Sequence, residues 1–123
     1  MVNVIIPTTS WSIRQKLAHG ESIGIFFHSP TCGHCHEASA ILHQILPQIP
    51  VPVYGINLVQ DDSLATQFKL EGTPTLILVA GDTVVSRLVG LHDADTYFQF
   101  FTKAIEDGQS DDEPEGETNE RDD

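Results

Sequence analysis

Short apolar runs and stretches with one apolar face alternate along this chain. Residues 23–27 form a continuous apolar run of strand length, which is typical of a central strand buried on both faces. Between residues 32 and 46 the apolar positions recur at helical spacing instead, which predicts a helix with one buried face. The pattern predicts strands over residues 3–6, 23–27, 51–58, 75–79 and 83–89. It predicts helices over residues 11–19 and 32–46, a short helix from a Ser63 cap to Phe68 or Lys69, and a last helix from an Asp93 or Asp95 cap to Ile105.

The order of these predicted elements is that of an α/β fold. Strands and helices alternate through the first half of the chain, which implies parallel strands joined by right-handed crossovers. The loop Ala80-Gly81-Asp82 joins the last two strands as a hairpin, so antiparallel pairing is expected there. The first helix has candidate caps and an imperfect apolar side: Thr8, Thr9 and Ser10 for the cap, and Trp11, Ile13, Leu17 and Ala18 for the side. We therefore expect a mixed sheet with the last helix covering one face.

Acidic residues are concentrated at the carboxyl end. The chain has 123 residues and a net charge of −12, from 18 Asp and Glu against 6 Lys and Arg. Residues 107–123 hold nine of the acids and one base, and they include no large apolar side chain. Such a segment cannot bury enough surface to offset its ordering entropy. We therefore predict one domain over residues 1–106 and an acidic, disordered tail over residues 107–123.

The same composition argues against several functional classes. Six scattered bases do not form the basic patch of a nucleic-acid-binding protein. No apolar run reaches the roughly 18 residues that cross a membrane. The first seven residues lack the basic region and long apolar stretch of a signal peptide, so we expect a cytoplasmic protein. In a reducing compartment, two cysteines three positions apart indicate redox chemistry or metal binding rather than a structural disulfide.

The stretch that carries chemistry is Ser29-Pro30-Thr31-Cys32-Gly33-His34-Cys35-His36, between the buried strand and the amphipathic helix. Cys32 is expected at the helix N-terminus, where free amides and the helix dipole favour a thiolate. Cys35, one turn further in, is expected to be more shielded. An exposed thiolate that attacks a disulfide and a shielded thiol that resolves the mixed disulfide fit this asymmetry. Gly33 leaves room for a partner chain to approach.

This arrangement resembles the thioredoxin family over roughly residues 3–106. The resemblance rests on Cys32-Gly33-His34-Cys35 after a buried strand, on Gly72-Thr73-Pro74-Thr75 before a later strand, and on the hairpin that ends near Gly90. It implies a thioredoxin fold with helices on both faces of a central mixed sheet. It also implies a cis peptide bond before Pro74, beside the cysteine pair, and pairing of substrate backbone with Thr73. The Cys-Gly-His-Cys form resembles protein disulfide isomerase domains.

The resemblance implies a protein disulfide reductase that exchanges its Cys32–Cys35 dithiol with disulfides of protein substrates. It implies re-reduction by an NADPH-dependent thioredoxin reductase. No metal or other cofactor is needed, because the cysteine pair is itself the redox centre. We expect a monomer with neither a nucleic-acid nor a membrane partner.

The sequence departs from the family at positions that handle protons. Thioredoxins carry a buried acid six residues before the first cysteine, and this chain has Phe26 there. A Lys that often pairs with that acid corresponds approximately to Gly55. Candidates for proton transfer are therefore His28 and His36, and a His34 imidazole between the cysteines would stabilise the reduced thiolate, which makes the disulfide a better oxidant.

Three alternatives stay open from the sequence. Cys32-Gly33-His34-Cys35-His36 also matches the C-x-x-C-H attachment motif of c-type haem. The same cysteines and histidines could ligate zinc, although a closed structural site needs four ligands. The loss of the buried acid and of the Trp that usually precedes the first cysteine, here Thr31, also fits a non-catalytic binding module on the same fold.

Overall fold

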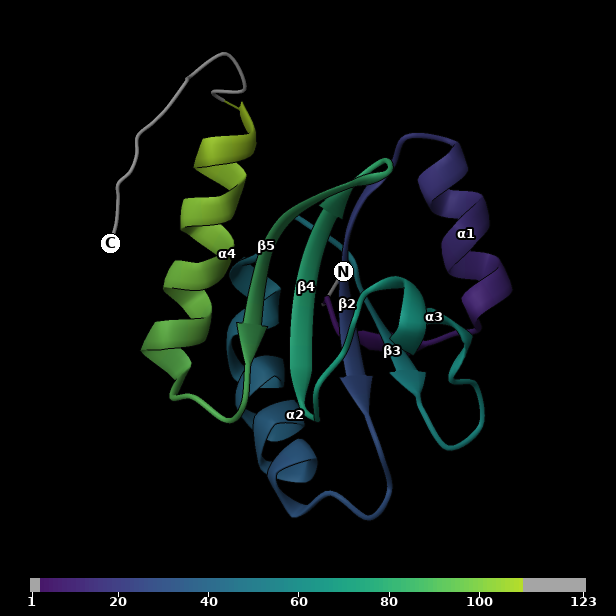
Figure 1. Cartoon of the computed structure of the whole chain (residues 1–123). Coiled ribbons are helices and arrows are strands. Elements are labelled where there is room, and N and C mark those ends of the chain that lie inside the picture. The colour runs from purple at the N-terminus through teal and green to yellow at the C-terminus, as the bar shows by residue number, and fades with distance from the viewer. Residues whose placement is uncertain (1–2, 110–123) are drawn as a thin grey trace.

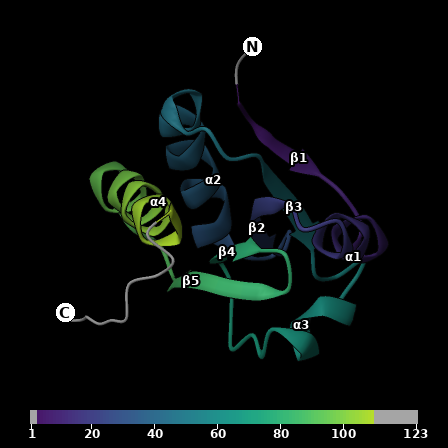
Figure 2. The ribbon, with the colours of Figure 1, turned by 90° about the horizontal axis from the view of Figure 1, so that it is seen from above.

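The strands form one sheet in the order β1-β3-β2-β4-β5, with helices on both of its faces (Figures 1 and 2). The computed structural model describes residues 3–109. Along the chain the elements are β1 (Ile5–Pro7), α1 (Ser10–Ala18), β2 (Ser22–His28), α2 (Gly33–Ile45), a 3₁₀ turn (Leu46–Gln48), β3 (Val53–Asn57), α3 (Ser63–Gln67), β4 (Thr75–Ala80), β5 (Thr83–Val89) and α4 (Ala94–Gln109). The predicted order of strands and helices is confirmed.

The pairing of the strands is mixed, as the sequence predicts. Strands β1 and β2 both lie parallel to β3, whereas β4 is antiparallel to β2 and β5 is antiparallel to β4. Strand β2 is therefore central, and each of its residues 23–27 is buried. This position explains why that run is apolar throughout instead of alternating.

Two apolar cores lie on opposite faces of the sheet. Helices α2 and α4 cover one face, and their apolar residues pack with Phe26, Val53, Leu76 and Leu78. Helices α1 and α3 cover the other face, where a second core is formed by Ile13, Ile23, Ile25, Phe27, Ile56, Leu64, Phe68, Ile77 and Val79. Because successive strand residues point to opposite faces, Phe26 and His28 share the α2 face.

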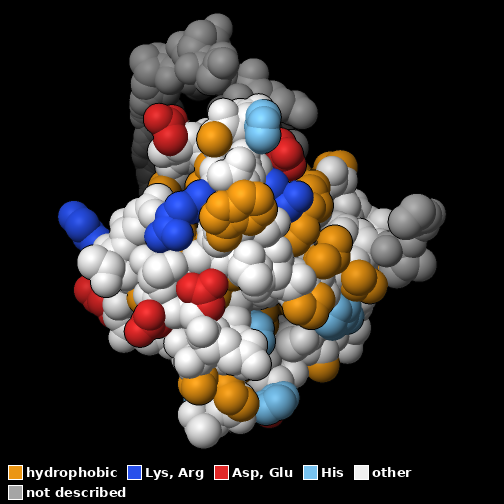
Figure 3. Space-filling model, turned by 90° about the vertical axis from the view of Figure 1, so that its right-hand side faces the viewer, with side chains coloured by type: hydrophobic (Ala, Val, Ile, Leu, Met, Phe, Trp, Pro, Cys, Tyr) orange, Lys and Arg blue, Asp and Glu red, His pale blue; other side chains and the backbone are white. Residues whose placement is uncertain are grey.

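Two details of the helix predictions are wrong. Trp11 does not belong to a buried side of α1, since its side chain is 70 % exposed. On the side of the molecule that carries α1 and α3, hydrophobic side chains lie in separate patches among polar ones (Figure 3). Ser63 is the first residue of α3 rather than its cap, and its hydroxyl donates to Asp61.

Other caps follow the sequence predictions. The Thr9 hydroxyl accepts the backbone N–H of Ser12 and so caps α1. The Asp93 carboxylate accepts the backbone N–H of Thr96 at the start of α4, at 2.9 Å.

Helix α4 continues to Gln109, past the predicted end at Ile105. The predicted tail beyond residue 109 lies outside the described residues. No helix in the described part of the chain is long and apolar enough to span a membrane.

Three loops meet at one end of the sheet. The register places Thr75 opposite Phe27 on one side and opposite Val89 on the other. The end of β2, the start of β4 and the end of β5 therefore lie side by side. The cysteine loop follows β2, the Thr73–Pro74 loop precedes β4, and Gly90 follows β5, so the topology assembles the predicted site from distant segments.

Candidate active site

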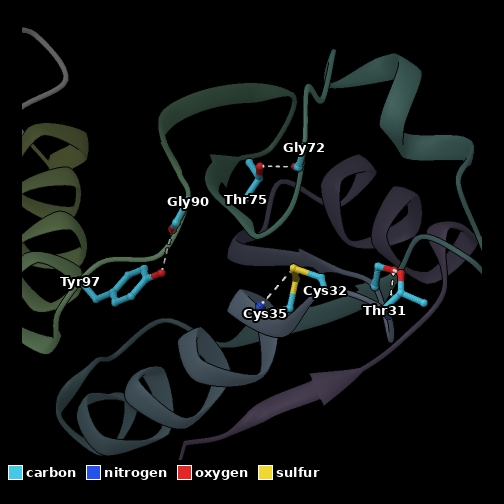
Figure 4. The surroundings of a disulfide bond; sticks show 8 residues. Thr31, Cys32, Cys35, Gly72, Thr75, Gly90 and Tyr97 are labelled. Atoms are coloured by element: carbon cyan, nitrogen blue, oxygen red, sulfur yellow. Dashed lines mark hydrogen bonds between the residues drawn. A yellow bond between two sulfur atoms is a disulfide. The ribbon is translucent and has the colours of Figure 1, made fainter.

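Cys32 is the N-cap of α2, as predicted. Its backbone is extended, and Gly33 begins the helix. The backbone N–H of Cys35 donates to the Cys32 sulfur at 3.2 Å (Figure 4). The loop that leads to Cys32 is a tight turn, because the Cys32 N–H donates to the Ser29 carbonyl and the Ser29 hydroxyl contacts that of Thr31. A thiolate at Cys32 would therefore face a backbone amide and the positive end of the helix.

The two cysteines are joined as a disulfide and differ in exposure. Their Cα atoms are 5.2 Å apart, within the range that a disulfide spans. Cys32 is half-buried, whereas only 3 % of Cys35 is exposed. A substrate can therefore reach the first sulfur more readily than the second. Gly33 is exposed, and a Cβ there would meet nothing within 4 Å, so the surface beside Cys32 is open.

The Thr73–Pro74 loop is held at the same end of the molecule by polar contacts. The Thr73–Pro74 peptide bond is cis, as the family resemblance implies, and Pro74 is buried. The Thr75 hydroxyl donates to the Gly72 carbonyl at 2.8 Å, and the Gly90 N–H donates to the Pro74 carbonyl at 2.8 Å. Figure 4 shows Gly72 and Thr75 on the opposite side of the disulfide from the body of α2.

Helix α4 fixes the neighbouring Gly90 through a buried tyrosine. The Tyr97 hydroxyl donates to the Gly90 carbonyl at 3.0 Å (Figure 4). Burial raises the pKa of Tyr97, so the hydroxyl keeps its proton and remains a donor. The His92 ring packs edge-on against the Tyr97 ring. The sequence predicts the helix that carries Tyr97 but not this hydrogen bond, because the position of the Gly90 carbonyl is set by the chain path after β5.

A cavity of about 270 Å³ lies behind the disulfide, between α2 and the ends of β2 and β3. Cys35, His28 and His36 line it, together with polar side chains that the sequence analysis did not single out, Ser39 and Asn57. Asn57 could have been found, because it ends β3 beside His28 in parallel register and the carboxyl ends of neighbouring parallel strands share an edge. Ser39 carries no such signal.

The histidines of the motif occupy different surroundings. His28 is half-buried, and its ring stacks on Phe26 with centroids 5.6 Å apart. His34 and His36 are exposed on the first turn of α2. Burial lowers the pKa of His28, and the charge of His36 lowers it further. Of the three histidines, only His28 is partly shielded from solvent, and it lines the same cavity as Cys35.

Comparisons with known proteins identify the family. The thioredoxin family model matches residues 4–103. The chain belongs to the thioredoxin family. It is 31 % identical to a thioredoxin of Chlamydia pneumoniae over 80 residues, which are 64 % of this chain and 74 % of that protein. It is 30 % identical to protein disulfide-isomerase A4 of Bos taurus over 74 residues, which are 55 % of this chain and 12 % of that protein.

Solved thioredoxin structures share the fold. Thioredoxin from Trypanosoma brucei brucei superposes with a TM-score of 0.77 at 14 % identity, covering 87 % of this chain and 96 % of that one. A thioredoxin mutant from Halobacterium salinarum NRC-1 gives a TM-score of 0.74 at 20 % identity, covering 84 % and 92 % of the two chains. The thioredoxin fold predicted from the sequence is confirmed.

Family and site together define the general chemistry. The chain is a thiol–disulfide oxidoreductase, and its redox centre is the Cys32–Cys35 pair. Thioredoxins need no external cofactor for this chemistry, because the electrons are held by the two sulfurs. Both cysteines are engaged with each other, and residues 3–109 contain no group of three or more His, Cys, Asp or Glu side chains placed to hold a metal ion.

Proposed function

We propose that this thioredoxin-family protein reduces disulfides of other proteins, with Cys32 as the attacking thiolate and Cys35 as the resolving thiol. The unequal exposure of the two cysteines at the start of α2 carries the proposal. Cys32 is the more exposed of the two cysteines, which favours it as the one that a substrate disulfide reaches, and the helix N-terminus favours its ionised form.

The reaction has two exchange steps. The Cys32 thiolate attacks one sulfur of a substrate disulfide, which forms a mixed disulfide and releases the other substrate sulfur as a thiolate. The Cys35 thiolate then attacks the Cys32 sulfur, which forms the Cys32–Cys35 disulfide and releases the second substrate sulfur. The substrate disulfide gains two electrons, which the cysteine pair loses, and the two substrate thiolates take up protons.

The surface beside Cys32 supports an extended protein segment as substrate. Thr73 is half-buried, and within residues 3–109 no hydrogen bond engages its backbone groups. An extended chain crossing this loop could pair with them as strands pair at a sheet edge. Gly33 and His34, which directly follow Cys32, are exposed, so a substrate segment at Thr73 would have open surface beside Cys32.

Re-reduction of the disulfide requires an electron donor, for which we propose an NADPH-dependent thioredoxin reductase in the cytoplasm. The relatives named thioredoxin support this assignment. We propose a monomer as the working unit, without a nucleic-acid or membrane partner.

Trapping of the mixed disulfide tests the assignment of roles. The Cys35→Ser variant should accumulate a covalent complex with a purified disulfide-containing protein such as insulin, because the second step has no thiol. The Cys32→Ser variant should form far less complex, since Cys35 is buried. Non-reducing electrophoresis and intact mass measurement would quantify both. Equal trapping by the two variants would refute the assignment, and the absence of insulin reduction by the wild type would refute the reductase function.

A further inference from the structure

The resolving thiol faces a proton-transfer problem. Cys35 is 3 % exposed, and its sulfur must lose a proton before it can attack the mixed disulfide. Burial disfavours the charged thiolate, so a nearby acceptor is needed. The residue that precedes Cys32 by six positions, Phe26, is apolar and cannot accept the proton. The acceptor has to come from elsewhere in the surroundings of Cys35.

The residues that line the cavity behind Cys35 limit which groups can accept its proton. Its volume of about 270 Å³ is far more than the space of one water molecule. The titratable groups of the described residues that line it are Cys35 and His36 of α2 and His28 of β2, and no carboxylate is among them. Strands β1 and β3 contribute uncharged residues to the same wall, Ile5 and Asn57. A proton that leaves Cys35 into this cavity therefore meets an imidazole.

Packing holds the His28 ring at the cavity. One side of the ring stacks on Phe26, with an angle of 20° between the two planes. Gly55 of β3 leaves space beside the ring, since a Cβ at that position would lie 3.4 Å from His28 Nε2 and 3.0 Å from a methyl carbon of Ile5. His36, by contrast, is exposed on the outer turn of α2.

We infer that His28 is the proton acceptor for Cys35 in the resolving step, directly or through water in the cavity. This inference rests on the proposed function of the cysteine pair. His28 takes the proton of the Cys35 thiol, the resulting thiolate attacks the Cys32 sulfur, and the bond from that sulfur to the substrate breaks. The electron pair leaves on the substrate sulfur. His28 then returns its proton to that thiolate or to water, which completes the balance.

The protonation state of His28 fits this role. Its pKa lies below the ordinary histidine value of 6.5, because the ring is partly buried and because His36 is nearby. At neutral pH the ring is therefore mainly neutral and able to accept a proton.

The two steps can be measured separately with dithionitrobenzoate, a small aromatic disulfide. Attack by Cys32 releases one thionitrobenzoate, and attack by Cys35 on the mixed disulfide releases the second. In single-turnover stopped flow at neutral pH, His28→Phe should leave the first release near the wild-type rate. The second release should slow by on the order of 100-fold, the typical effect of losing a general base. The phenyl ring preserves the stacking on Phe26.

Controls separate an acid–base role from a structural one. His36→Phe, the same substitution at the exposed neighbour, should leave the second release nearly unchanged. The deficit of His28→Phe should shrink as the pH is raised well above the ordinary thiol pKa of about 8.5, because hydroxide then deprotonates even a buried thiol without help from His28. In His28→Ala, added imidazole should accelerate the second release, whereas His28→Phe should not respond, because its ring fills the space.

The results that would overturn the role of His28 differ from the result that would overturn the proposed function. A second release in His28→Phe close to the wild-type rate would overturn the role of His28. So would an equal loss in His36→Phe, or a deficit that persists unchanged at alkaline pH and is not relieved by imidazole. If the wild-type protein released no thionitrobenzoate at all, the proposed function itself would fail, and the role of His28 would fall with it.

Discussion

Asp61 joins the start of α1 to the loop before α3, and its removal should destabilise the fold measurably. The carboxylate accepts the Ser10 backbone N–H at 2.8 Å and the Ser10 hydroxyl at 2.7 Å. It also accepts the Ser63 hydroxyl at 3.1 Å. Ser10 is only 2 % exposed, so its donors have no ready access to water. Asp61→Asn keeps the shape of the side chain but replaces one acceptor oxygen by a donor.

The size of the effect follows from these bonds. An unsatisfied buried donor costs about 1–3 kcal/mol, and a lost bond to a charged group costs a similar amount. Because the remaining amide oxygen still accepts one bond, we expect Asp61→Asn to lower the free energy of unfolding by about 2 kcal/mol. For a domain of this size that corresponds to a fall in Tm of roughly 10 °C. Asp62→Asn is the matched control, because Asp62 makes no side-chain capping bond.

The pH dependence gives a sharper test. The hydrogen bonds from the Ser10 N–H and hydroxyl, followed by those from Ser63, lower the pKa of Asp61 to about 2. A carboxyl whose pKa is lower in the folded state stabilises the fold fully above its unfolded pKa, about 3.9, and loses that contribution as pH falls toward the folded value. Urea unfolding at several pH values should therefore show the difference between wild type and Asp61→Asn narrowing from about pH 4 to about pH 2. A difference that is absent at neutral pH, or constant across this range, would refute the reasoning.

Two further predictions concern the active-site loop and the core. His34→Pro should make the Cys32–Cys35 couple more reducing by roughly tens of millivolts in a glutathione redox buffer, where about 30 mV corresponds to 1.4 kcal/mol. The reason is that proline can neither donate a hydrogen bond to the Cys32 thiolate nor carry a charge beside it. An unchanged or higher reduction potential would show that His34 does not set the potential. Gly24→Ala should lower stability to urea by about 1–3 kcal/mol, since its Cβ would lie 3.1 Å from a Val53 methyl carbon and 3.3 Å from a Leu78 methyl carbon, and both neighbours are buried in the core with little room to move. Gly33→Ala, whose Cβ meets nothing within 4 Å, is the control, and equal stability of the two variants would contradict this account of the packing.

The fold could be predicted because its strands carry strong local signals. A fully apolar run such as residues 23–27 has few places in a domain other than the centre of a sheet, and it forms that centre as β2. The first helix was less predictable. Trp11 and Ile13 are two positions apart, so a helix directs them to different sides, and only Ile13 reaches the core. The role of Asp61 could not be foreseen, because Ser10 lies 51 residues away.

The cysteine site was predictable for a related reason. The motif, the helix start and the exposure of the two sulfurs are all local, and each follows from the position of Cys32 between a strand and a helix. The partners of His28 are not local. Its place opposite Asn57 and at the cavity that Cys35 also lines depends on which strands are neighbours and in what register, so the sequence alone did not indicate a proton route.

The register of β2 and β3 links the two departures from the family pattern, Phe26 and Gly55. Phe26 of β2 lies opposite Gly55 of β3, and the next inward-facing pair is His28 and Asn57. An aromatic ring at 26 supplies the surface on which His28 stacks, and the missing side chain at 55 leaves the space that its Nε2 approaches. Where the family resemblance implies an acid and, approximately, a lysine, this chain has Phe26 and Gly55, which flank the His28 ring. A titratable group, His28, therefore lies two residues further along the same strand face and lines the cavity that Cys35 also lines, which is the arrangement that its inferred role as proton acceptor requires.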